Sequence, residues 1–213
     1  MKEEEPIDME TRIIEAAKIV FVRKGYEATK MGDIAAEVGI SRTALHYYFR
    51  TKELLFEAIF GQLMGRLLPN IAILMEEAST ILEKIPGIIE QYLSAIKQNP
   101  LFPIFIINEM NRNPEHLFQT IMKNSNRIQP LLQLKKQVYD EMENGLLKKR
   151  PLIDVASTLL SLVIFPFLIH LPLTAIFLDG DRKAFEKYID NRASLIIEVM
   201  HHLLTPDKNR KQL

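Results

Sequence analysis

The feature that most constrains the fold is a three-residue turn, Gly-Ile-Ser, at positions 39–41. Apolar residues at helical spacing predict one short helix before it, over about residues 29–38, and another after it, over 42–48. Gly39 permits a sharp change of direction, and Ser41 is a favourable N-cap for the second helix. Because the linker is so short, the two helices must cross steeply instead of lying antiparallel, which is typical of a helix-turn-helix motif.

Helical patterns on both sides complete a small three-helix unit and begin a fourth helix. Apolar residues over about residues 10–24 predict the first helix, and Gly25 stands where its C-cap is expected. Thr51 is a favourable cap for a long helix that starts at Lys52. The predicted core of the unit consists of side chains that share the inner faces of these helices: Phe21, Tyr26, Ile34, Ala35, Val38, Leu45 and Phe49.

The remainder of the chain also has a helical pattern, without the alternation of a strand. Breaks are expected at Pro69, Pro86, Asn99-Pro100, Asn113-Pro114, Gln129-Pro130, Arg150-Pro151 and Asp179-Gly180. The predicted helical segments are 71–85, 87–98, 101–112, 115–147, 152–178 and 182–204. The expected fold class is therefore all-α, with a three-helix N-terminal module followed by a helical body, about nine helices.

The distribution of charge favours a nucleic-acid contact at the N-terminal module. The formal net charge of the whole chain is zero, which by itself argues against a nucleic-acid binder. Residues 11–52, however, carry eight basic and four acidic side chains, a local charge of +4 that leaves −4 on the rest. Such an excess also occurs on ordinary protein surfaces, so it supports the motif without identifying a function.

The residue types that the sequence lacks limit where the protein can be located and which kinds of chemical site it can form. The chain has no cysteine, so a disulfide framework and a thiolate metal site are impossible, and an intracellular protein is expected. The acidic start, MKEEEPIDME, lacks the apolar stretch of a signal peptide, which favours a cytoplasmic location. The histidines have no metal-ligand spacing, and neither a phosphate-binding loop nor a catalytic constellation is present. We therefore expect no enzyme activity, no metal and no cofactor.

The N-terminal pattern resembles the TetR family of bacterial transcriptional regulators. The resemblance runs without gaps over about 45 residues, from Thr11-Arg-Ile-Ile-Glu-Ala-Ala through Gly25-Tyr26 and Val38-Gly39-Ile40-Ser41 to Leu45-His-Tyr-Tyr-Phe-Arg-Thr-Lys-Glu-Leu-Leu55. It does not extend beyond about residue 60. The resemblance implies a helix-turn-helix DNA-binding domain in residues 1–50 and a ligand-binding and dimerisation domain in residues 51–213.

The residues expected to contact double-stranded DNA come from helical geometry and from the resemblance. With the core side chains inside, Arg42, Thr43, His46 and Tyr47 share the outer face of the third helix, which suits the major groove. Tyr47 and Lys52 match phosphate-contacting positions of the family, whereas His46 departs from its usual tyrosine. Thr29 and Lys30 stand at the start of the second helix, where the helix dipole favours a phosphate. For each of these residues the alternative is ordinary solvated surface.

The body contains an uncharged run, Val155 to Leu178, that is long enough to cross a bilayer. It contains Pro166 and Pro172, and no basic cluster follows it, so a buried helix, or two helices broken near these prolines, is the preferred interpretation. We expect no membrane contact. The resemblance implies a homodimer joined by two C-terminal helices of each subunit, for which residues 152–165 and 182–204 are the candidates.

The aromatic and methionine side chains of the body are candidates for a ligand pocket, although such residues are more often plain core. The predicted pocket residues are Tyr92, Phe102, Phe105, Ile106, Met110, Phe118, Met122 and Phe165. The resemblance thus implies a homodimeric repressor that binds a palindromic operator and is released by a small hydrophobic or amphipathic effector. Two alternatives remain: a DNA-bound structural or protein-interaction factor without an effector, and a membrane-tethered DNA binder.

Overall fold

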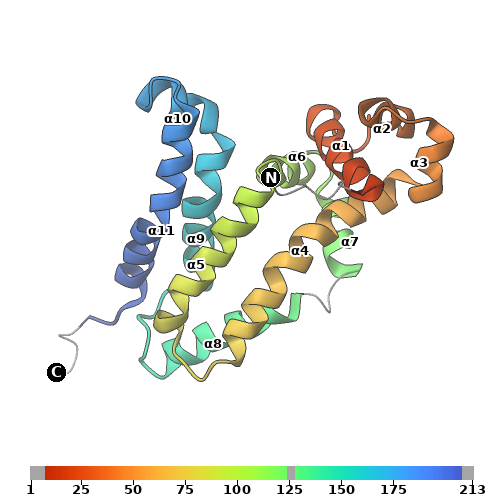
Figure 1. The fold of residues 1–213 in the computed structure, drawn as a ribbon. Helices are drawn as coiled ribbons and strands as arrows, with labels where there is room; N and C mark the ends of the chain where they lie inside the picture. The colour runs from red at the N-terminus through yellow and green to blue at the C-terminus, as the bar shows by residue number, and fades with distance from the viewer. Residues whose placement is uncertain (1–7, 124–127, 208–213) are drawn as a thin grey trace, which may run out of the picture. The chain divides into compact units, whose positions relative to one another are not determined.

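The computed structural model describes residues 8–123 and 128–207, and all secondary structure in these ranges is helical (Figure 1). The described helices are α1 (Met9–Lys24), α2 (Met31–Val38), α3 (Arg42–Tyr48), α4 (Lys52–Glu76), α5 (Ile81–Gln98), α6 (Phe102–Arg112), α7 (Pro114–Lys123), α8 (Gln129–Glu143), α9 (Leu152–Leu168), α10 (His170–Phe177) and α11 (Arg182–Leu204). The all-α prediction and the N-terminal helix-turn-helix are confirmed.

The chain forms two compact units. The first combines Met1–Gly65 with Leu101–Ser125, and the second combines Arg66–Pro100 with Asn126–Leu213. The first unit therefore contains α6 and α7 in addition to the N-terminal helices. The predicted boundary at residue 50 separates the DNA-binding domain from the ligand-binding and dimerisation domain, and it is not a boundary between these compact units. It stays a prediction.

The helix-turn-helix forms as its sequence predicts. Gly39 has a left-handed conformation, with φ of 81° and ψ of 33°, which glycine adopts without steric cost. The hydroxyl of Ser41 accepts a hydrogen bond from the backbone N–H of Ala44 at 3.0 Å and caps α3. Leu45 and Phe49 face inward and are buried. The turn and the cap thus fix the direction in which α3 leaves the unit.

An aromatic core joins α1, α4 and α6 in the first unit. The ring of Phe56 on α4 lies 6.0 Å from that of Phe21 on α1 and 4.9 Å from that of Phe105 on α6. Phe102 on α6 lies 6.5 Å from Phe60 on α4. These edge-to-face and tilted contacts add to the burial of large apolar surfaces. The N-terminal helices are therefore packed against α6 by rigid side chains.

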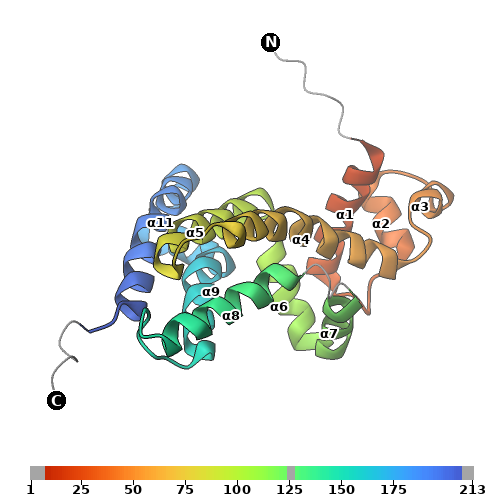
Figure 2. The same cartoon turned by 90° about the horizontal axis from the view of Figure 1, so that it is seen from below.

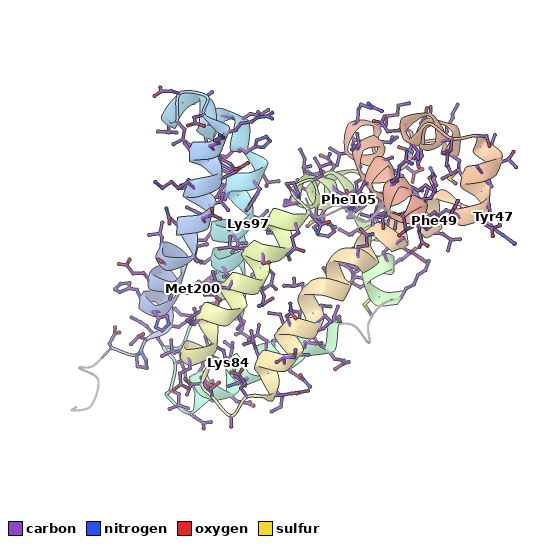
Figure 3. The ribbon with its side chains drawn as sticks, in the orientation of Figure 1. Tyr47, Phe49, Lys84, Lys97, Phe105 and Met200 are labelled. Atoms are coloured by element: carbon purple, nitrogen blue, oxygen red, sulfur yellow. The ribbon has the colours of Figure 1, made fainter. Side chains whose placement is uncertain are left out.

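The second unit is built around α5, which packs against α9 and α11 (Figures 1 and 2). Thr80 and Glu83 form a capping box at the start of α5. The carboxylate of Glu141 on α8 accepts hydrogen bonds from the N–H of Ile81 at 3.0 and 3.1 Å. Lys97 near the other end of α5 forms an ion pair with Asp190 on α11 (Figure 3). Both ends of α5 are therefore fixed by polar contacts.

Three prolines that suggest helix breaks lie inside helices. Pro69, Pro86 and Pro166 interrupt neither α4, nor α5, nor α9. The predicted breaks at Pro69 and Pro86 are therefore wrong. Each proline removes one backbone hydrogen bond, and the surrounding tertiary packing outweighs that loss. The actual break follows α4 at residues 77–80, where the capping box starts the next helix.

Two long predicted segments are divided. The expected segment 115–147 contains α7 and α8, and residues 124–127 between them lie outside the described residues. The segment 152–178 consists of α9 and α10, which are bent by 71° relative to each other at Ile169. The predicted break into two helices within this segment is confirmed. The breaks at Asn99-Pro100, Asn113-Pro114, Arg150-Pro151 and Asp179-Gly180 also fall at helix ends.

By length and composition, α4 could cross a membrane, and α9 with α10 forms a bent pair that passes the same test. Core helices of water-soluble proteins meet this criterion as well. In α4, Leu55, Phe56 and Ile59 are buried against the protein. Packing within the molecule therefore covers only part of this apolar stretch, of which 31% is buried.

Candidate nucleic-acid interface

The third helix has one face in the core and one in solvent. Leu45 is fully buried, whereas Tyr47 is 85% exposed at the outer side of α3 (Figure 3). Arg42 and Thr43, in the first turn, are exposed as well. The N-terminal residues of such a helix are those that reach base edges in a major groove. Exposure of these three side chains on a rigid helix is the geometry that base contact requires.

Arg42 and His46 interact within the outer face. The Nε of Arg42 donates a hydrogen bond to Nε2 of His46 at 3.3 Å, and Nδ1 of His46 lies 3.1 Å from the carbonyl oxygen of Arg50. With Nε2 as the acceptor, the ring proton belongs on Nδ1, which then donates to that carbonyl. His46 is half-buried. His46 therefore orients the guanidinium of Arg42, and it lies on the face of α3 that is expected to enter the major groove of DNA.

At the start of α2, Lys30 and Thr29 differ in their accessibility. Lys30 is exposed, and its backbone N–H donates to the carboxylate of Asp33 at 2.9 Å. Thr29 is only 2% exposed, and its hydroxyl donates to the carbonyl oxygen of Gly25 at 2.6 Å. The expected backbone contact by the Thr29 side chain therefore requires correction, because that hydroxyl already stabilises the turn after α1.

Lys52 is also engaged within the protein. Its Nζ donates to the carbonyl oxygens of Tyr26 and Glu27 at 3.0 and 3.1 Å. The same ammonium lies 4.3 Å from the centre of the Tyr26 ring, within range of a cation–π contact. Lys52 thus connects the head of α4 to the turn that precedes α2. A phosphate contact by Lys52 stays a prediction.

A partly buried polar cluster that sequence reasoning missed lies in the same unit, and we name it the His116 cluster. Nδ1 of His116 on α7 lies 2.7 Å from a carboxylate oxygen of Glu109 on α6. Nε2 lies 3.0 Å from Oε2 of Glu53 on α4. The hydroxyl of Tyr26 donates to that same oxygen at 2.6 Å, and its ring stacks on the imidazole at 4.2 Å.

Burial and hydrogen bonding determine the charge states of two members of the cluster. Burial tends to raise the pKa of Glu53, but hydrogen bonds from Tyr26 and His116 outweigh this effect and leave the pKa lowered. Burial, together with the hydrogen bond and negative charge of Glu53, raises the pKa of Tyr26. The cluster therefore combines an ionised Glu53 with a neutral phenol.

Further polar contacts connect α6 and its C-terminal end to α1 and to the turn after it. The side-chain amide of Asn108 donates to the carbonyl oxygen of Val22 at 3.2 Å, and that of Asn113 donates to Glu27 at 3.1 Å. The guanidinium of Arg112 occupies the space in which a side chain of Gly25 would lie. These contacts join α6 to α1 and to the turn that follows it.

The second unit contains an apolar pocket with a volume of about 470 Å³. Its lining comes from α5, α8, α9 and α11 and includes Ile85, Ile89, Tyr92, Leu134, Lys135, Val138, Ile153, Val155, Leu159, Leu160, Met200 and Leu204. Lys135 is the charged member of this lining, and its side chain is exposed. Met200 lies on α11 beside α5 (Figure 3). The volume and apolar walls fall within the range of small-molecule sites.

The predicted pocket residues are not brought together. Tyr92 lines the pocket of the second unit, but the other seven do not. Phe102 and Phe105 are core residues of the first unit, where Ile106 is half-buried. The remaining four, Met110, Phe118, Met122 and Phe165, are exposed. Helical spacing identifies an apolar face but does not show whether the face lines a cavity, which explains the difference.

In residues 8–123 and 128–207, no group of three or more histidine or acidic side chains is arranged to hold a metal ion. A buried helix-turn-helix core with an exposed third helix defines a DNA-binding protein of the helix-turn-helix class. Residues 13–59 match the family model of bacterial regulatory proteins, tetR family. This match assigns the N-terminal module, and not the whole chain, to the family, whose members are transcriptional regulators.

Individual relatives agree with this assignment. The fatty acid metabolism regulator protein of Bacillus subtilis (strain 168) is 26% identical over 121 residues, which cover 57% of this chain and 61% of that protein. The uncharacterized HTH-type transcriptional regulator YfiR of the same organism is 46% identical over 50 residues, 24% of each chain. The matches thus span less than two thirds of either relative.

The fold of the whole chain is shared with solved structures. The ketosteroid transcriptional regulator KstR2 of Mycobacterium tuberculosis has a TM-score of 0.68 at 14% identity, with 95% of this chain and 98% of that chain covered. At this identity the likeness concerns the fold. Regulators of the TetR family bind DNA and typically act as dimers.

Proposed function

We propose that the chain is a homodimeric transcriptional repressor that binds a palindromic operator and is released from it by a small apolar or amphipathic effector. The observation that carries the proposal is the outer face of α3, where Arg42, Thr43 and Tyr47 are exposed on a helix whose other face is buried. One recognition helix reads few base pairs, whereas two helices at a fixed separation read both halves of a palindrome.

A second copy of the chain is the proposed partner of the C-terminal helices. Leu160 and Phe165 on α9 and Leu195 on α11 are large apolar side chains that are exposed in the single chain. These residues fall in the two segments that the sequence indicates for dimerisation. Burying them against a second copy would remove apolar surface from water.

The phosphate part of the interface is tested by combining Lys30→Ala with Tyr47→Phe. Both side chains are exposed, whereas Lys52 is avoided because it also holds two backbone carbonyls. The variant is expected to bind all DNA sequences more weakly by a similar factor. Loss of one lysine contact per half-site should reduce the slope of log affinity against log salt by about two per dimer. The affinity is measured by fluorescence anisotropy between low and high salt.

The matched control for this experiment is Lys149→Ala, an exposed lysine between α8 and α9 in the second unit. It should leave the salt slope unchanged. If the double variant keeps the affinity and the salt slope of the unmodified protein, the proposed docking face is wrong.

The effector site of the proposal is the apolar pocket of the second unit. Apart from Lys135 and the hydroxyl of Tyr92, its lining consists of hydrocarbon and thioether groups, which favours an apolar ligand. Lys135 lies at the exposed side, where its ammonium is available to an anionic group. Two proteins to which the chain is similar are named a fatty acid metabolism regulator and a ketosteroid transcriptional regulator. An apolar chain that ends in a carboxylate combines the two features of this pocket.

Decanoate is expected to raise the thermal unfolding midpoint through this pocket. A ligand at a hundred times its dissociation constant stabilises the folded state by about 2.7 kcal/mol, which corresponds to about 5–10 °C. Lys135→Ala should reduce the effect of decanoate but not that of decanol. Lys136→Ala is the control, because this neighbouring lysine pairs with Asp140 and does not line the pocket. Equal shifts for decanoate in both variants would exclude Lys135 as the anion partner.

A protein-interaction factor without an effector is the alternative function. The exposed side chains Leu171, Ile176 and Phe177 on α10 favour it, because they form an apolar surface outside the pocket. Absence of any ligand-dependent release from the operator, combined with sequence-specific DNA binding, would favour this alternative. A tethered protein would instead be recovered with membranes after cell fractionation.

A further inference from the structure

The His116 cluster is distinguished by the position of its imidazole between two carboxylates. Nδ1 and Nε2 lie 2.7 and 3.0 Å from oxygens of Glu109 and Glu53, respectively. A neutral imidazole has one N–H and can donate only one of these two hydrogen bonds. Both contacts are hydrogen bonds with ionised carboxylates only when the ring carries two protons. The geometry therefore accommodates a doubly protonated ring between the two carboxylates.

Because Glu109 is buried, the contact between the two side chains depends on the proton on Nδ1 of His116. Glu109 lies almost entirely inside the protein, at 3% exposure. Within residues 8–123 and 128–207, the hydrogen bond found for its carboxylate is the one from His116. Burying a carboxylate without a donor is costly. Loss of the proton from Nδ1 would leave the buried carboxylate of Glu109 without a hydrogen-bond donor. The surrounding contacts would then have to rearrange.

The cluster extends from His116 to the parts of the molecule that meet DNA in the proposed function. Oε2 of Glu53 accepts from both His116 and Tyr26. The carbonyl oxygen of Tyr26 accepts in turn from Lys52. The same turn leads directly into α2, whose N-cap is the exposed Lys30. These contacts link the His116 ring to the head of α4 and to the turn before α2.

Other charged and titratable groups surround the ring. Lys123 on α7 lies 3.5 Å from Glu53 and 2.9 Å from Glu57 on α4. Glu27 in the turn after α1 accepts from Asn113, which precedes α7. Tyr26 remains neutral through the physiological range because its pKa is raised. The lysine offsets part of the negative charge of α4 but does not contact Glu109, so it cannot replace His116 there.

We propose that His116 is a positioning residue for DNA binding, whose protonated ring holds Glu53 and Glu109 together and thereby fixes the turn before α2 and the head of α4. Operator affinity then decreases as the ring loses its second proton. This inference rests on the proposed DNA-binding function, and it adds a dependence on pH that does not involve the groups facing the DNA.

The test measures operator affinity at pH 6 and pH 8.5 for the full-length protein. The operator is the duplex enriched from a random pool by the unmodified protein. All proteins carry His46→Gln, so that the histidine near the DNA face does not contribute to the pH profile. With His116 present, affinity should fall about fivefold or more between the two pH values. His116→Gln should be weak at both pH values and should lose most of this dependence.

His170→Gln is the matched control, because His170 is exposed on α10 in the second unit. It should retain the full pH dependence. If His116→Gln alone does not fold, the variant that also carries Glu109→Gln removes the unpaired buried charge and is measured instead. Circular dichroism and thermal unfolding at both pH values separate unfolding from weaker binding.

A measurement on the unmodified protein supplies an independent outcome. When binding depends on a proton, bound DNA must in turn favour that proton. The NMR titration midpoint of the His116 ring should therefore move to higher pH when the operator is present. An unchanged midpoint, or a His116→Gln variant with the same pH dependence as its parent, overturns the inference. If the unmodified protein enriches no DNA sequence at all, the proposed DNA-binding function is wrong, and the inference about His116 falls with it.

Discussion

Replacing Arg42 by alanine is expected to weaken operator binding by about thirtyfold or more and to relax base preference at one position of each half-site. A bidentate contact between arginine and guanine contributes about 1–3 kcal/mol of discrimination. A symmetric dimer loses this contact twice, so a total of about 2–6 kcal/mol is expected. Arg42 is oriented by its hydrogen bond to His46, which makes its contribution larger than that of a freely mobile side chain.

The effect of Arg42→Ala is measured by anisotropy on the operator and on duplexes with each base substituted in turn. Arg150→Ala is the matched control, since it removes an exposed arginine from the segment between α8 and α9 in the second unit. The control should bind as the unmodified protein does. If Arg42→Ala binds every duplex with unchanged affinity and unchanged preference, α3 does not read the bases in the manner proposed.

Replacing Phe56 by alanine is expected to have the largest effect on stability, a loss of about 3–5 kcal/mol in the free energy of unfolding. Phe56 has no exposed surface. Its ring contacts Phe21, Phe105 and the imidazole of His116, the last at a ring separation of 4.5 Å. Truncation would leave a cavity between rigid aromatic rings, which cannot easily close.

Urea unfolding monitored by circular dichroism measures the decrease in the free energy of unfolding caused by Phe56→Ala. The control is Phe177→Ala on α10, where the ring is 73% exposed and little apolar contact is lost. It should change the free energy of unfolding by less than about 0.5 kcal/mol in the single chain. A loss below about 1 kcal/mol for Phe56→Ala would mean that α1, α4 and α6 do not share a tightly packed core.

The N-terminal unit was predictable because its determinants are local. Gly39 and Ser41 specify the turn and the cap through backbone conformation and one hydrogen bond, which depend on neighbours in sequence. Apolar spacing then places Leu45 inside and leaves Tyr47 outside. Thr29 shows the limit of this reasoning, because its hydroxyl is engaged by the carbonyl of Gly25 and not by solvent.

Helix boundaries in the body were less predictable. Pro69 and Pro86 suggested breaks because proline is unfavourable in a helix, but burial of neighbouring apolar residues keeps both helices continuous. The capping box of Thr80 and Glu83 was the signal in the sequence for the true start of α5.

The polar cluster and the pocket depend on distant parts of the chain. His116 meets Glu53 across 63 positions and stacks on Tyr26, which is still farther away in the sequence. Nothing in local spacing indicates such a pairing. The pocket likewise requires α5, α8, α9 and α11 to leave space between them. Periodicity shows which faces are apolar, whereas tertiary packing decides which of these faces enclose a cavity.

Enrichment of bound duplexes from a random DNA pool by the full-length protein, followed by sequencing, tests the central claim most directly. The account predicts an inverted repeat with two equivalent half-sites, because two copies of α3 related by a two-fold axis read the same bases. Arg42→Ala should lose the preference at one equivalent position in each half. A pool without any enriched sequence, or an enriched sequence without two-fold symmetry, would contradict a homodimeric operator-binding regulator.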